Sequence, residues 1–116
     1  MITGINLQDT IDYVIPEDKE NPTVWKIGVV PSYIFAKMFS NGSTDDIESV
    51  FNLLKVSIKG WESFNVEFRT EKQKLFGREI DVVPIELLDR IPLNVITKLV
   101  NKVIELNRIS EIERKN

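Results

Sequence analysis

The chain has 116 residues, of which 42% are hydrophobic and 28% charged, and its formal net charge is −3. This length suits one hydrophobic core, so we expect a single domain over residues 1–116, and the composition is far from that of disordered chains. The absence of cysteine excludes disulfides and thiolate metal sites. The acidic balance argues against a nucleic-acid partner, because nucleic-acid binding depends on a basic surface.

No segment approaches the apolar length needed to cross a bilayer, so we expect no membrane partner. The first residues, 1–6, lack the basic start and the apolar core of a signal peptide. A small secreted domain would usually also need disulfides. These features together predict a cytoplasmic protein.

The first third of the chain predicts strands separated by prolines. Apolar residues alternate over 11–15, and a run rich in β-branched residues covers 23–30 between two prolines. The next apolar run, 32–39, is too short for periodicity to assign, and we interpret it as a short helix that Ser32 caps.

A helix is predicted over about residues 43–60. Ser43 supplies a capping hydroxyl, and Asp45 and Asp46 place negative charge at the helix start, where the macrodipole favours it. After this start, apolar residues recur at spacings of three and four: Ile47, Val50, Phe51, Leu54, Ile58 and Trp61. Gly60 is the predicted end of the helix.

Polar and apolar residues alternate at 65–69 and again at 79–82, which predicts a hairpin whose loop carries Lys72, Gln73 and Lys74. Two segments that begin with proline follow, a short helix at 84–90 and a long helix at 92–113. We therefore expect an α+β fold, with a small antiparallel sheet packed against two main helices, about 43–60 and 92–113. The apolar face of the last helix is expected to consist of Leu93, Ile96, Leu99, Val100, Val103 and Leu106.

The chain has no histidine and no cysteine, the usual general base, nucleophile and metal ligands, so we expect no metal site and no enzyme. None of its five glycines forms a phosphate-binding loop, and we expect no cofactor. A carboxylate-based enzyme is the remaining catalytic alternative, using Asp9 with Asp12, or Asp45 with Asp46 and Glu48. Isolated acidic residues are usually solvated, which favours the non-enzymatic interpretation.

Aromatic and aliphatic side chains are the candidates for binding a protein partner. Trp61 and Phe64 are candidate anchors, although tryptophan is more often a core residue, as we expect for Trp25. Ile104, Ile109 and Ile112 widen the apolar surface of the last helix beyond a single stripe. This surplus indicates self-association or docking onto a partner.

Gly60-Trp61-x-x-Phe64 follows a predicted helix, a short hairpin comes next, and the final helix runs into Glu113-Arg114-Lys115-Asn116. Together these features, over roughly residues 20–116, resemble small proteins of the morphogenesis operons of tailed bacteriophages. The upstream segment 21–28 is similar to the first strand of those proteins. Tail assembly chaperones of this group are more purely helical than this chain, whose first third is predicted to form strands.

The resemblance implies a non-enzymatic assembly factor in the host cytoplasm that binds the tape-measure or tail-tube protein. A virion or tail-associated component is an alternative with the same sequence features. A phage-encoded inhibitor of a host defence protein is a second alternative, because an acidic surface can occupy a nucleic-acid site. In each case Trp61, Phe64 and the last helix are the expected contact elements.

Overall fold

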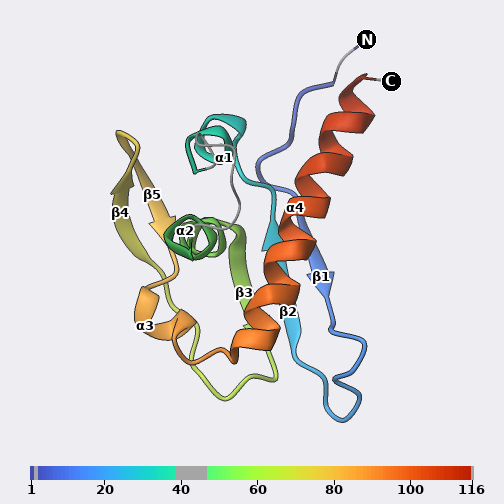
Figure 1. Cartoon of the computed structure of the whole chain (residues 1–116), viewed down its shortest axis with the longest axis vertical. Coiled ribbons are helices and arrows are strands. Elements are labelled where there is room, and N and C mark those ends of the chain that lie inside the picture. The colour runs from blue at the N-terminus through green and yellow to red at the C-terminus, as the bar shows by residue number, and fades with distance from the viewer. Residues whose placement is uncertain (2, 39–46, 116) are drawn as a thin grey trace.

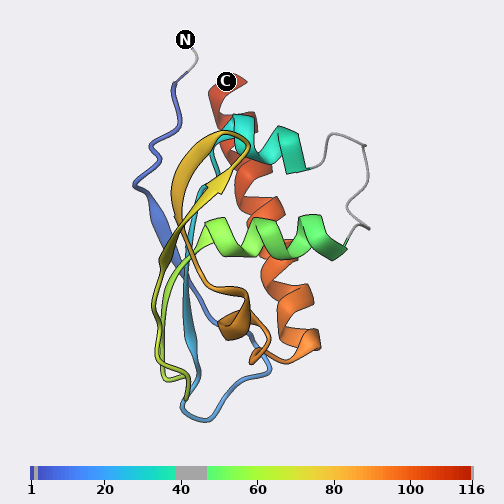
Figure 2. The ribbon, with the colours of Figure 1, turned by 90° about the vertical axis from the view of Figure 1, so that its left-hand side faces the viewer.

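The computed structural model describes residues 1, 3–38 and 47–115, and for 108–115 it describes the backbone alone. The antiparallel sheet β1-β2-β3 forms one layer, and α2 and α4 lie together on one side of it and cross steeply (Figures 1 and 2). This arrangement confirms the predicted α+β fold with two main helices. The elements are β1 (Thr10–Tyr13), β2 (Val24–Gly28), α1 (Ser32–Met38), α2 (Ile47–Ser57), β3 (Ile58–Glu62), β4 (Glu71–Leu75), β5 (Arg78–Val82), α3 (Ile85–Leu88) and α4 (Leu93–Lys115).

The predicted end of the second helix at Gly60 is wrong, because the chain leaves the helix at Ser57 and enters β3 directly. Residues 43–46 of that prediction lie outside the described part of the chain. Ile58 pairs with Ile27 of β2, and Trp61 pairs with Trp25. β-branched and aromatic residues suit such a half-buried pleated surface.

A β-bulge explains why the buried residues of β3 have a spacing in the sequence that is typical of a helix. The register between β2 and β3 shifts between Lys26 and Ile27, so Lys59 is an extra residue in β3. In a regular strand, residues 58 and 61 would lie on opposite faces. The bulge instead leaves both Ile58 and Trp61 buried, and a spacing of three therefore looks like one face of a helix.

The predicted hairpin exists, but its first strand is β4 and not 65–69. β4 pairs with β5 from Glu71↔Val82 to Leu75↔Arg78, so Lys72, Gln73 and Lys74 lie in a strand and not in a loop. The two residues of the turn, Phe76 and Gly77, both have positive φ, 51° and 81°. Positive φ at both positions is the signature of a type I′ turn. This hairpin lies beside α2, where the Val83 amide donates to the Lys55 carbonyl at 3.0 Å.

α4 covers the inner face of the sheet (Figure 1). Its buried stripe packs into the same core as β2 and α2. Leu93 does not belong to this stripe, contrary to the prediction, because it lies at the outer edge of the helix face and is 73% exposed, whereas Ile96 in the same turn is buried. The stripe consists of Ile96, Leu99, Val100 and Val103, with Ile104 and Leu106 partly buried beside it.

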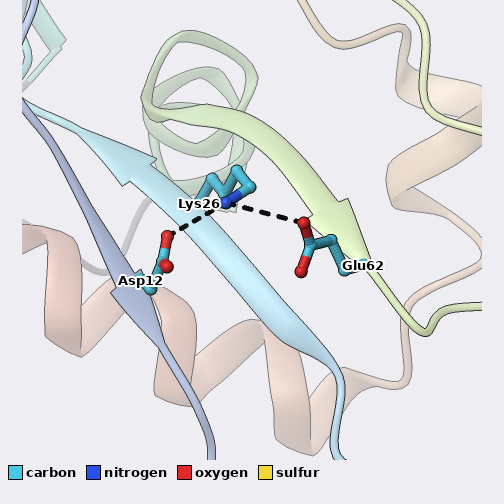
Figure 3. A network of polar contacts seen from close by, with 3 residues as sticks. All are labelled: Asp12, Lys26 and Glu62. Carbon is cyan, nitrogen blue, oxygen red and sulfur yellow. Dashed lines mark hydrogen bonds and ion pairs between the residues drawn. The ribbon is translucent and has the colours of Figure 1, made fainter.

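The outer face of the sheet is polar. The Lys26 ammonium lies 3.2 Å from an Asp12 oxygen and 3.9 Å from a Glu62 oxygen, which links all three strands (Figure 3). Gly60 lies opposite Lys26 in the register, and a Cβ there would make an ordinary van der Waals contact of 3.6 Å with the Cδ of this lysine. These exposed ion pairs contribute little stability and make a solvated face.

Candidate protein-binding surface

The predicted anchor Trp61 lies at the centre of an aromatic cluster. Its ring contacts Trp25, Phe64 and Phe68 at centroid distances of 5.8, 5.3 and 4.9 Å, all close to edge-to-face. Its indole Nε1 donates to the Val66 carbonyl at 2.6 Å, and the residue is 9% exposed. Trp61 is therefore a core residue, which was the alternative interpretation of the sequence, and Trp25 is buried as expected.

The second predicted anchor, Phe64, lies at the edge of this cluster and is half-buried. It lines a hollow of about 330 Å³ between the β1–β2 loop and the start of α4. The hollow has apolar walls and a polar rim. The apolar residues are Ile15, Trp25, Phe64, Pro92 and Val95, and the polar ones are Glu17, Asp18, Thr23, Asn94 and Lys98.

A second hollow of about 340 Å³ continues along α4 from the first. Both are lined by Glu17 and Lys98, whose ion pair spans 2.8 Å. Further along, the Lys102 ammonium lies 5.5 Å from the centre of the Tyr13 ring and 3.5 Å from Glu105. We call the two hollows together the α4 seam. It joins β1, the β1–β2 loop and one flank of α4.

The ion pair that both hollows share changes the titration of Glu17. A hydrogen bond from the Lys98 ammonium holds the pKa of the Glu17 carboxyl below its ordinary value of 4.5. A lowered folded-state pKa means that the pair stabilises the fold at neutral pH. That contribution is lost as the pH falls through the lowered pKa.

Replacing Lys98 by methionine should therefore return the pKa of Glu17 toward 4.5. Methionine keeps the apolar stem but removes the ammonium that favours the carboxylate. The measurement is an NMR titration of the Glu17 side-chain carboxyl. Lys19→Met, in the same loop, is the control and should leave this pKa unchanged. A Glu17 pKa that is the same with and without Lys98 would contradict the ion pair.

The three predicted isoleucines lie in the second half of α4. Ile104 is partly buried against the core. The backbone stays helical through Ile109 and Ile112, whose side chains lie outside the described part. The helical repeat places positions 109 and 112 on the flank that carries Lys102 and Glu105, which is the flank of the seam.

The structure does not bring all predicted contact residues into one patch. Trp61 and Phe64 are in contact, but Phe64 lies beside the first turns of α4, and position 112 follows Val95 by about 25 Å along the helix. The α4 seam lies along this line. Sequence analysis missed its polar members Glu17 and Lys98, which lie far apart in the chain and carry no local signal.

The described residues contain no group of three or more carboxylates that could hold a metal ion. Among the helices that the structure describes, none is both long and apolar enough to pass through a membrane. Comparison with protein families, characterised proteins and solved structures finds no match to this chain.

Proposed function

We propose that the chain is a non-enzymatic assembly factor of a tailed bacteriophage, which binds the tape-measure or tail-tube protein through the α4 seam. The phage part of the proposal is supported by the sequence resemblance over residues 20–116. The protein-binding part is carried by one observation, the seam itself. Its apolar walls and charged rim have the composition of a protein interface, in which an apolar centre is enclosed by polar groups.

In this proposal the residues of the seam have different roles. Phe64 and Val95 supply apolar contact area at one end, and positions 109 and 112 extend the contact along α4. Trp61 supports Phe64 from within the core, since the two rings are 5.3 Å apart. The Lys98–Glu17 ion pair lies where the two hollows of the seam meet. The partner must place complementary charges against this pair.

Capture from phage-infected cells tests the proposal. The tagged full chain should recover the tape-measure or tail-tube protein, and deletion of its gene should reduce the number of assembled tails. Lys98→Glu should abolish recovery, because it places a second carboxylate beside Glu17 on the seam. Lys74→Glu changes the net charge equally on exposed β4 and should recover the partner as well as the wild type does.

The other outcomes separate the alternatives. Presence of the chain in purified particles would favour a virion component. Recovery of a host nuclease or other defence protein, with binding that weakens steeply with salt, would favour an inhibitor. Self-association that Lys98→Glu disrupts, with no tail protein recovered, would assign the seam to a homo-oligomer. Failure to recover any virion precursor, together with normal particle assembly after deletion, would overturn the proposal.

A further inference from the structure

We infer that the tip of the β4–β5 hairpin is a second protein-binding surface, which takes a short acidic segment carrying an apolar residue. The surface, here called the hairpin tip, consists of Phe76, Gly77 and Arg78 together with Tyr33 and Lys37 of α1. The turn lies next to α1 in both views, at the opposite end of the long axis from the β1–β2 loop (Figures 1 and 2). It is therefore separate from the hollow that contains Phe64.

Phe76 breaks the local rules of its turn. The first position of a type I′ turn requires positive φ and favours asparagine, aspartate or glycine. Phe76 adopts a φ of 51° there with its side chain 39% exposed. Left-handed backbone is unfavourable for a bulky residue, and the exposed ring gains only part of the burial that would offset this cost. A role for the ring outside folding accounts for both features.

Tyr33 adds a second exposed ring to the hairpin tip. It is 46% exposed, and the Arg78 guanidinium carbon lies 4.7 Å from its ring centre. The Lys37 ammonium lies 5.6 Å from the same centre. The cations hold the ring in place from α1 and from β5, so two aromatic side chains are presented on an ordered surface.

The charges of the hairpin tip identify the partner. Lys37 and Arg78 form no ion pair with a carboxylate within the described residues, whereas six other ion pairs are formed there. Two cations beside the Tyr33 ring, with the exposed Phe76 in the turn that precedes Arg78, match a segment with one or two carboxylates and an apolar anchor. A nucleic acid would need a more extended basic surface, and the chain has a net charge of −3.

A peptide titration tests this inference independently of tail assembly. The probe is a ten-residue fluorescent peptide with a central phenylalanine between two aspartates on each side. Its binding to the full chain should shift the backbone NMR signals of Tyr33, Phe76, Gly77 and Arg78. Phe76→Asn should raise the Kd about tenfold, as expected for the loss of a contact residue. The same substitution should raise the Tm by about 4 °C, because asparagine suits the turn.

The opposite directions of these two effects separate binding from folding. Arg78→Gln should also weaken the peptide, while Leu93→Asn, at an exposed apolar residue far from the tip, should leave its Kd unchanged. A control peptide with asparagine in place of every aspartate should bind at least tenfold more weakly. No binding of the acidic peptide at millimolar concentration would overturn the inference. Tighter binding of a ten-residue thymidine oligonucleotide, with the same NMR shifts, would overturn it in favour of a nucleic acid.

Discussion

Replacing Trp61 by alanine should lower the free energy of unfolding by about 3–5 kcal/mol, the usual cost of deleting a large buried aromatic side chain. The residue is 9% exposed and its ring meets three other aromatic rings within 5.8 Å. A domain of this kind has a total stability of about 5–15 kcal/mol, so much of it would be lost. Urea denaturation measures this change as a lower midpoint at an unchanged slope.

A matched pair of tryptophan substitutions separates the hydrogen bond of Trp61 from its packing. Trp61→Phe removes the donor to the Val66 carbonyl, which then lacks that partner in the core. Trp25→Phe removes a similar volume, but the Trp25 Nε1 has no hydrogen-bond partner in the described part of the chain. We expect Trp61→Phe to cost about 1–3 kcal/mol more than Trp25→Phe. Equal losses for the two Trp→Phe variants would contradict a contribution of this hydrogen bond to stability. A small loss for Trp61→Ala would contradict the core role of Trp61.

The features that the sequence predicted well are those with strong local signals. Pro92 at the first turn of α4 and the repeat of apolar residues after it identified a helix at 92–113, and the structure has Leu93–Lys115. The short helices at 32–39 and 84–90 likewise appear as α1 and α3. Proline and helical periodicity act within a few residues, so they can be recognised without tertiary information.

The features that were missed depend on contacts between distant segments. The bulge at Lys59 exists only because β3 pairs with β2, and it gives Ile58 and Trp61 a spacing typical of a helix. The alternation at 64, 66 and 68 resembles a strand, but Phe64 and Phe68 contact Trp61 and the Val66 carbonyl accepts its hydrogen bond. Periodicity shows which residues are buried, and it cannot show against what they pack.

The same distinction applies to the candidate surfaces. Phe64 was identifiable because an aromatic residue after Gly60-Trp61 is a local sequence feature, and it lines the first hollow of the α4 seam. Glu17 and Lys98 are 81 positions apart, so only the fold shows that they meet. Phe76 did carry a local signal, since a bulky residue before Gly77 is unusual in a two-residue turn. It was missed because the first strand of the hairpin was placed at 65–69, which left residues 72–74 as the predicted loop, whereas that strand is β4, Glu71–Leu75.

Leu99→Ala should cost about 2–5 kcal/mol of stability, whereas Leu93→Ala should cost about 0.5 kcal/mol or less. The two leucines lie on the same helix, but Leu99 is 0% exposed in the core and Leu93 is 73% exposed. The same side-chain deletion therefore creates a cavity at one position and only removes exposed surface at the other. Since both were expected on one apolar face, this pair tests the orientation of α4 directly.

Urea denaturation of both variants beside the wild type is the measurement, with helix content by circular dichroism as a check on folding at zero denaturant. Alanine has the higher helix propensity, which offsets part of the loss expected for Leu93→Ala. Equal losses at both positions would mean that the first turn of α4 is packed and not exposed. A large loss confined to Leu99 would instead support an α4 whose inner stripe packs in the core while Leu93 lies at the surface.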